Sequence, residues 1–438
     1  MKKLVYILFS LVILAGCEPK IDELSPNKGS ADFSRFVSVG NSLVAGYADG
    51  ALYFSAQKNS FPNLLAQQFQ FAGGGTFVQP VVNSEFGVEF PGSMPRLKLG
   101  YSTSCAGTSM GPVPDIGPRD PVAPVGYLVN NLGIPGAKSF HLLAPGYAML
   151  NPYYARFATS ATNMVIQEIP ALNPTFFSLW LGNNDVLGYA TSGGVGDTIT
   201  GLPTFGYAMG AVVQSLVGTG TKGVIANLPD ITSAPFFTTI PYNGLVLPRQ
   251  SLVDSVNWAM QTIYKLPFVY QLGPNPFLVG DPTAPYFFKV RQMQPGELIL
   301  LTVPQDSMKC YGMGLIHAIT HVPWPIPNQF VLTQDEINNI EVAVAGYNQI
   351  IAGLAQTHGL ALADMNAKMK NLQGGIIWDG IKMNTQFVTG GVFSLDGVHP
   401  NSRGYALITN YFIEAINAEY GSTVPFVDIT KYSGVLFP

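Results

Sequence analysis

The chain has 438 residues, with 22 Lys and Arg against 26 Asp and Glu, so its formal charge is −4. Without Lys2 and Lys3, which lie in a predicted leader, the balance is 20 against 26, which argues against a nucleic-acid-binding protein because such proteins need a basic face. Hydrophobic residues make up 47% of the chain, which excludes general disorder. The only long apolar run, residues 4–16, is shorter than the roughly 20 residues of a membrane span, so a polytopic membrane protein is excluded.

The first 17 residues, MKKLVYILFSLVILAGC, have the pattern of a secretory leader: two lysines, an apolar core and small residues. The end of this segment, LAGC, resembles the bacterial lipobox, which implies a signal peptide over 1–16 and lipidation of Cys17. Acyl chains on Cys17 would anchor an exported protein to a membrane without spanning it. Residues 17–34 are polar and contain Pro, Gly and Ser, as in a tether. The alternative is a plain cleaved signal with Cys17 incidental.

Strand-like and helix-like segments alternate along the rest of the chain. Short apolar runs predict strands at 35–40, 125–132, 175–181, 223–228 and 360–363. Helical spacing predicts helices at 61–69, 154–169, 205–217, 251–266, 333–358 and 403–418. This alternation predicts an α/β fold, a three-layer α/β/α sandwich around a mostly parallel, flavodoxin-like sheet.

Two stretches interrupt this alternation. Residues 72–124 are rich in Gly, Pro and Ser with few periodic signals, and residues 229–328 are rich in Pro and aromatic residues. No linker divides the chain into two independent cores. We therefore expect one domain over 35–438, with two large insertions at about 51–130 and 230–390.

A serine follows the first predicted strand. Ser42, after Gly40 and Asn41, would sit on a tight turn above the carboxyl edge of the sheet, where open α/β folds place their sites. The start of the next helix would supply backbone N–H groups and a positive dipole end. A strand-end serine is also a common helix N-cap, so this position alone leaves a nucleophile and a cap as alternatives.

The segment 396–404 places Asp396 three residues before His399. An aspartate at this spacing can bond the imidazole in a tight loop, fix its tautomer and stabilise the imidazolium. The alternative is a helix cap followed by a loop histidine.

Two further segments lie after predicted strands. Asn184 can direct its amide at a developing oxyanion, although an Asx-turn is the alternative. Gly136 lets its backbone N–H approach a ligand without a side chain in the way. Since these positions share one edge of one sheet with Ser42 and His399, we expect a nucleophile, a base and oxyanion donors in a single site.

This ordered set resembles the SGNH, or GDSL, hydrolases. The four blocks are VSVGNSLVAGYADG at 37–50, NLGIPGA at 131–137, LGNND at 181–185 and SLDGVHPNSRGYALI at 394–408. The resemblance implies Ser42 as the nucleophile, His399 as the general base and Asp396 as the residue that orients it. It also implies an oxyanion hole of the Ser42 N–H, the Gly136 N–H and the Asn184 side chain. The mechanism of the family is a serine acyl-enzyme that uses no metal and no cofactor.

The chain departs from the family pattern in two ways. The usual Gly-Asp-Ser-Leu is Gly40-Asn41-Ser42-Leu43 here, so the charge of the aspartate is lost while its size and hydrogen bonding remain. The chain is also about twice as long as the family core. The insertions would surround the edge of the sheet that carries the site.

The remaining cysteines and two histidines leave further alternatives. Cys105 and Cys310 would form a disulfide in an oxidising compartment or remain two separate thiols. His317 and His321 have the i, i+4 spacing of helix-borne metal ligands, but no Glu follows in the His-Glu-x-x-His manner. Loop or packing histidines are therefore favoured over a metal site.

The sequence predicts an exported, membrane-anchored serine hydrolase of carboxylic esters. Its substrate is either an acyl lipid or an O-acetylated glycan, and the width of the acyl pocket near Ser42 would separate the two. The alternative from another class is a non-catalytic surface lipoprotein that binds glycans or proteins on a hydrolase fold. The oligomeric state does not follow from the sequence.

Overall fold

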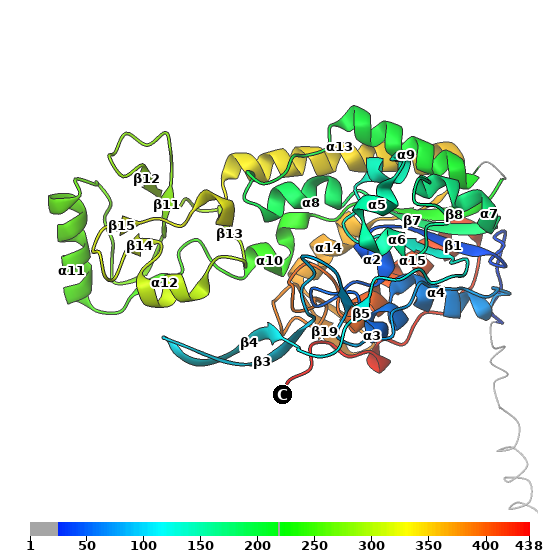
Figure 1. Ribbon diagram of the computed structural model, residues 1–438, viewed down its shortest axis with the longest axis horizontal. Helices are drawn as coiled ribbons and strands as arrows, with labels where there is room; N and C mark the ends of the chain where they lie inside the picture. Colours follow the sequence, from blue (N-terminus) through cyan, green and yellow to red (C-terminus); the bar gives the residue numbers. More distant parts are fainter. Residues whose placement is uncertain (1–24, 218–219) are drawn as a thin grey trace, which may run out of the picture.

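The structure is a computed structural model that describes residues 25–217 and 220–438. The predicted signal peptide and Cys17 lie outside the described residues. Among the described helices, none is both long and apolar enough to cross a membrane. A large core carries a smaller lobe at one end of the long axis of the molecule (Figure 1).

A five-stranded parallel sheet forms the centre of the core, in the order β17-β8-β7-β1-β6. Its strands are β1 (Phe36–Gly40), β6 (Asn131–Gly133), β7 (Phe176–Trp180), β8 (Lys222–Ala226) and β17 (Ala361–Ala363). By order of appearance in the chain, the sheet reads 2-1-3-4-5, as in flavodoxin-like folds. The winding reverses between β1 and β7, and ligands of such sheets bind at this reversal.

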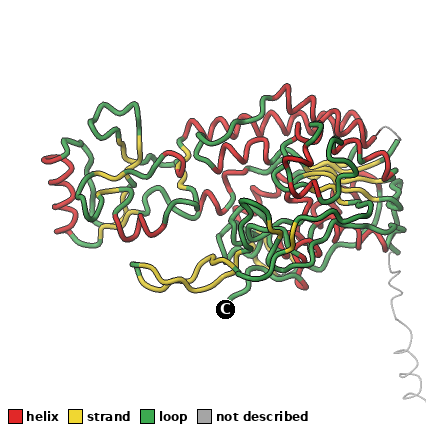
Figure 2. The backbone as a smooth tube through the Cα atoms, viewed as in Figure 1, coloured by secondary structure: helices red, strands yellow, loops and turns green. Residues whose placement is uncertain are grey.

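Helices cover both faces of the sheet, which confirms the predicted three-layer α/β/α fold. One face carries α9 (Leu202–Val217) and α13 (Gln334–His358), and the other carries α15 (Ser402–Tyr420) and α4 (Phe61–Gln70) (Figure 1). In Figure 2 the yellow strands of the sheet lie between these red helices. β1 and β7 are buried along their whole length because both of their faces are covered.

Shorter helices surround the sheet. They are α2 (Ser42–Ala45), α5 (Tyr147–Leu150), α6 (Pro152–Ala155), α7 (Ile169–Leu172), α8 (Asn184–Thr191), α10 (Pro235–Thr238) and α14 (Met365–Gly374). Four 3-10 turns also lie in the core: Ser139–Leu143, Val165–Gln167, Ile231–Ser233 and Ile429–Lys431. A small hairpin joins β18 (Ile376–Trp378) and β19 (Ile381–Met383).

The first insertion contributes both to the core and to a long hairpin. Its elements are α3 (Phe54–Lys58), α4, β2 (Val88–Glu89), β3 (Leu97–Ser104), β4 (Gly107–Pro114) and β5 (Asp120–Pro121). The hairpin β3–β4 leaves the core and extends toward the lobe (Figure 1). The prediction that 72–124 is irregular was therefore wrong over β3–β4. Its strands are exposed on both faces for most of their length, so no apolar alternation marked them.

The second insertion forms the lobe, which has apolar clusters of its own. Its elements are β9 (Leu245–Leu247), α11 (Gln250–Trp258), a π-helical turn (Ala259–Ile263), β10 (Gly273–Asn275), β11 (Leu278–Gly280), β12 (Val290–Gln292), β13 (Leu298–Ile299), α12 (Gln305–Tyr311), β14 (Leu315–Ile316), β15 (Pro323–Trp324), a 3-10 turn (Asn328–Phe330) and β16 (Val331–Leu332). The predicted boundaries 230–390 are too wide, because α13, β17 and α14 of that range belong to the core.

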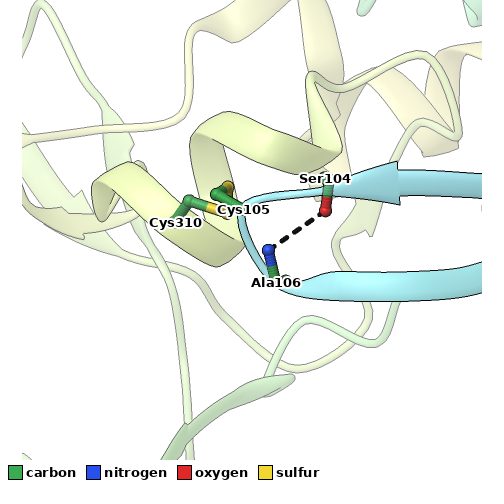
Figure 3. Close-up of a disulfide and its surroundings, with 4 residues drawn as sticks. All are labelled: Ser104, Cys105, Ala106 and Cys310. Atoms are coloured by element: carbon green, nitrogen blue, oxygen red, sulfur yellow. Dashed lines mark hydrogen bonds between the residues drawn. A yellow bond between two sulfur atoms is a disulfide. The ribbon is translucent and has the colours of Figure 1, made fainter.

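A disulfide between Cys105 and Cys310 joins the two insertions. Cys105 lies in the turn of the β3–β4 hairpin and Cys310 lies on α12 of the lobe (Figure 3). Of the two alternatives that the sequence left open, the structure therefore has the disulfide.

Three other predictions were wrong in part. Of the predicted tether 17–34, the described part, 25–34, is not free along its whole length, because Phe33 is 1% exposed and stacks on Phe69 in the core. Residues 125–132 are not one strand, because Gly126 has a φ of +75° and the segment pairs with the sheet only from Asn131. Residues 154–169 are not one helix, because Thr159 and Asn163 bond the Glu168 carboxylate and hold a loop.

Candidate active site

The nucleophile candidate lies where β1 meets α2. Asn41 is the N-cap of α2, and its side-chain oxygen accepts a hydrogen bond from the Leu43 N–H at 3.1 Å. This cap ends the strand and begins the helix within one residue. Ser42 is thereby the first helical residue, and its own N–H belongs to the first turn, where backbone N–H groups have no partner within the helix.

Ser42, His399 and Asp396 form one hydrogen-bonded chain. His399 Nε2 lies 2.8 Å from Ser42 Oγ, and His399 Nδ1 lies 2.9 Å from Asp396 Oδ2. Ser42 and His399 are 357 positions apart in the sequence, and the fold brings them together. The segment of Ser42 and the segment 396–404 therefore lie together, in the geometry that a serine nucleophile and its base require.

Asp396 is held by five hydrogen bonds. Its Oδ1 accepts from the N–H groups of Val398 and His399 and from the Ser394 hydroxyl, and its Oδ2 accepts from the Gly50 N–H and faces the His399 ring. Burial opposes its ionisation, but the adjacent imidazole and the N–H donors outweigh burial and lower the pKa of Asp396 to about 2. Asp396 is therefore an anion at neutral pH, oriented toward His399 Nδ1.

The second and third predicted segments also meet. The Asn184 amide donates to the Ala137 carbonyl at 2.9 Å, next to Gly136. Gly136 is exposed and has a φ of +79°, which only glycine adopts readily. Asp185, fully buried, accepts hydrogen bonds from the Ser139 N–H and hydroxyl at 2.8 Å and 2.7 Å. These bonds fix the loop of Gly136 against the start of α8.

The Asn41 side chain both donates and accepts hydrogen bonds, which an ionised aspartate cannot do. Its Nδ2 donates to the side-chain oxygen of Asn183 at 3.3 Å while its Oδ1 caps α2. A carboxylate has no N–H to donate. The amide thus joins the loop after β1 to the loop after β7, beside Ser42.

An apolar pocket of about 110 Å³ opens beside Ser42 and His399. Its wall comes from α8, α10, α14 and α15, and includes Leu187, Phe237, Met369, Leu372, Leu407 and Tyr411. The one lysine in the wall, Lys368, is paired with Glu414 at 2.6 Å and lies over the Tyr411 ring. The pocket therefore suits a hydrocarbon chain better than a polar group.

Sequence reasoning missed the segment that follows the nucleophile helix. Gly50 donates its N–H to Asp396 Oδ2 at 3.0 Å, and Asp49 accepts from the Leu395 N–H at 2.9 Å. The Tyr47 ring lies 4.8 Å from the His399 ring. The available signal was the Asp49-Gly50 dipeptide, which favours a tight turn. Nothing in a single sequence placed that turn against residues almost 350 positions away.

The histidines considered for a metal lie in a loop of the lobe. His317 Nδ1 accepts from the Ile319 N–H at 3.2 Å, and its ring packs on Trp324. Over the described residues, the group with metal-binding geometry is Cys105, Asp306 and Cys310, and both sulfurs are in the disulfide. His317 and His321 are not in that group.

The comparisons give structural likeness at low identity. The chain is similar to a lipase/acylhydrolase from Enterococcus faecalis, with 11% identity, a TM-score of 0.34, and coverage of 90% of this chain and 100% of that one. A putative GDSL-like lipase from Parabacteroides merdae has 10% identity, a TM-score of 0.35, and coverage of 90% and 99%. An extracellular lipase from Streptomyces rimosus has 11% identity, a TM-score of 0.33, and coverage of 87% and 99%.

No protein-family model and no curated protein sequence matches the chain. The fold assignment therefore stands on the chain's own sheet order and layers, and in structure the chain is similar to GDSL-like lipases and acylhydrolases.

Proposed function

We propose that this protein is a serine hydrolase of carboxylic esters, with Ser42 as nucleophile, His399 as general base and Asp396 as the carboxylate that orients it. The observation that carries the proposal is the continuous hydrogen-bonded chain from Ser42 Oγ through both nitrogens of His399 to Asp396, at 2.8 Å and 2.9 Å. Ser42 and His399 line an apolar pocket, and Asn184 lines the same pocket.

Each group has one task in this mechanism. His399 Nε2 takes the Ser42 hydroxyl proton as Oγ attacks the ester carbonyl carbon, and Asp396 stabilises the imidazolium. The Ser42 N–H, the Gly136 N–H and the Asn184 amide donate to the oxyanion of the tetrahedral intermediate. The imidazolium then protonates the departing alkoxide, which leaves an acyl-Ser42. Water, deprotonated by His399, attacks the acyl carbon and releases the acid and the free serine.

The pocket favours one of the two substrate classes left open by the sequence. An acetyl group would leave most of an apolar volume of about 110 Å³ unfilled. Each methylene that enters such a pocket contributes about 0.8 kcal/mol, or roughly fourfold in kcat/KM. The proposed substrate is therefore an ester with an acyl chain well beyond acetyl, in preference to an O-acetylated glycan.

The proposed location is the surface of a bacterial membrane, held by lipid on Cys17. This part rests on the leader and the LAGC segment, which are outside the described residues. Metabolic labelling with a fatty acid, followed by fractionation, tests it directly: label and membrane association should both be lost in Cys17→Ala. A soluble, unlabelled wild-type protein would refute the anchor and leave the hydrolase proposal standing.

The activity test uses the full-length protein in detergent micelles. Rates with p-nitrophenyl esters from acetate to palmitate are compared in the wild type, in Ser42→Ala and in Ser251→Ala. Ser251 is an exposed serine in the first turn of α11, in the lobe, so its variant controls for loss of a hydroxyl away from the site. We expect Ser42→Ala to lose activity by a factor of about 10⁴ or more and Ser251→Ala to keep it.

The chain-length profile separates the remaining alternatives. A maximum at medium or long chains supports the acyl-ester proposal, whereas activity confined to acetate supports the acetylated glycan. Equal rates in wild type and Ser42→Ala would refute the nucleophile assignment. Absence of any activity, together with glycan or protein binding, would favour the non-catalytic lipoprotein.

A further inference from the structure

We infer that Asp49 is a positioning residue for the Asp396–His399 loop, joining it both to the nucleophile helix and to the inserted hairpin. The inference rests on the proposed function, because it assigns a role within that same site. It concerns a carboxylate that does not touch the substrate pocket and acts through the backbone of the loop that carries Asp396.

Asp49 holds that loop from two sides. Its Oδ1 accepts from the Leu395 N–H at 2.9 Å, while its own N–H donates to the Ser394 hydroxyl at 2.9 Å. The Ser394 hydroxyl in turn donates to Asp396 Oδ1 at 3.1 Å. The next residue, Gly50, donates to Asp396 Oδ2 at 3.0 Å. The two residues immediately before Asp396 and Asp396 itself are therefore all fixed by the single turn 49–50.

The other half of the Asp49 carboxylate faces the first insertion. Its Oδ2 accepts from the Tyr53 hydroxyl at 2.6 Å and lies 3.8 Å from Arg96 Nε. The Arg96 guanidinium stacks on the Tyr53 ring at 4.1 Å. Leu97, the first residue of β3, donates its N–H to the Asp49 carbonyl at 2.8 Å. The base of the hairpin is thus bonded to the same residue that holds the Asp396 loop.

Asp49 occupies this position at a cost to the fold. Its φ of +52° lies in the left-handed region, which is disfavoured for residues that carry a Cβ, although aspartate adopts it more often than most. Burial raises the pKa of Asp49, and the Asp396 carboxylate adds to the rise, although bonds from Leu395 and Tyr53 oppose it. An ionised group with a raised pKa lowers folding stability above that pKa. The hydrogen bonds that Asp49 makes to the Asp396 loop accompany both costs, as expected of a residue that orients a reacting loop.

The test compares Asp49→Asn and Asp49→Ala with Asp379→Asn and Asp379→Ala. Asp379 is an exposed aspartate in the β18–β19 turn, with a φ of +47°, so it controls for the same substitutions in the same backbone conformation. Asparagine keeps an acceptor for the Leu395 N–H and tolerates left-handed backbone, while alanine loses the acceptor. All variants are studied as full-length protein in micelles.

Three readouts distinguish positioning from a merely structural role. We expect Asp49→Ala to lower kcat about 100-fold, with asparagine restoring most of it and KM unchanged, because a displaced base costs rate rather than binding. The thermal midpoint of Asp49→Asn at neutral pH should not fall below wild type, since a buried charge is removed. The low-field proton signal of His399 Nδ1–H, followed in ¹⁵N-histidine-labelled protein, should be lost in Asp49→Ala and kept in Asp379→Ala.

The outcomes remain separable from those of the proposed function. If wild type hydrolyses no ester, the hydrolase proposal fails, and the His399 signal still decides whether Asp49 orders the loop. Unchanged kcat and an unchanged signal in Asp49→Ala would overturn the inference. A fall in kcat matched by an equal fall in folded protein, with asparagine no better than alanine, would also overturn it, because Asp49 would then be structural only.

Discussion

Replacing Cys105 and Cys310 together by serine removes a cross-link between residues 205 positions apart. In the unfolded chain, the disulfide closes a loop of that length and so restricts its conformations. The loop-entropy relation gives a contribution of about 5 kcal/mol at 25 °C for a loop of this size. With an unfolding entropy of about 2 cal/mol/K per residue over the described chain, the loss corresponds to a midpoint lower by about 6 °C.

Activity should respond much less than stability. Neither cysteine lines the pocket, and the Ser42–His399–Asp396 chain lies in the core. We expect kcat at 25 °C to stay within about twofold of wild type, because neither cysteine takes part in the hydrogen bonds that hold Ser42, His399 and Asp396.

Thermal unfolding by circular dichroism, with and without reductant, measures the effect. Reductant should lower the midpoint of the wild type to that of the double variant and should leave the double variant unchanged. Equal midpoints for the oxidised wild type and the double variant would refute the loop-entropy reasoning. A matching fall in the single variant Ser104→Ala, in the same hairpin turn, would show that turn packing, not the cross-link, is responsible.

Three other predictions follow from the site and the caps. The pKa of Asp396 is lowered from 3.8 to about 2, so its ionised form contributes about 2 kcal/mol above pH 4 that is lost as pH falls toward 2. In urea titrations the stability gap between wild type and Asp396→Asn should therefore shrink over that pH interval, and a constant gap would contradict it. Met369→Trp fills part of the pocket and should lower kcat/KM for long-chain p-nitrophenyl esters by about 15-fold, the equivalent of two methylenes, while acetate hydrolysis stays unchanged; an equal loss for acetate would point to general damage. Thr333→Ala removes the capping box of α13 and should cost about 1 kcal/mol in urea unfolding, with Thr302→Ala, an exposed loop threonine, as the control without effect.

Elements with strong local signals were predictable from the sequence. α13 begins at the Thr333 cap and ends at Gly359, which has a φ of +60°, as the start and stop residues indicated. β1 and β7 were predicted within one residue at each end because continuous apolar runs mark strands buried on both faces. The helix expected at 154–169 failed because side chains around Glu168 satisfy the backbone in a loop, and periodicity does not report such bonds.

The candidate site was predictable to the extent that strand ends determine it. Ser42 and Asn184 follow β1 and β7, and parallel strands bring their carboxyl ends to one edge. The apolar pocket was not predictable, since its wall combines four helices whose packing no single sequence reveals. Asp49 was missed for the same reason: its partner at Leu395 lies 346 positions away.

The way in which the lobe joins the core affects how the sequence of the lobe can vary during evolution. The chain enters the lobe at Ile240 and leaves it at Val331, and both residues pair with Ile299. The segments that enter and leave the lobe therefore pair with the same strand. The residues between them can change in length or sequence without altering the strand order of the parallel sheet. The cross-link at Cys310 and the hydrogen bond from the Leu301 N–H to the Phe236 carbonyl at 2.9 Å hold the lobe at further places. The exposed surface of the lobe can therefore change during evolution while the geometry around Ser42 stays constant.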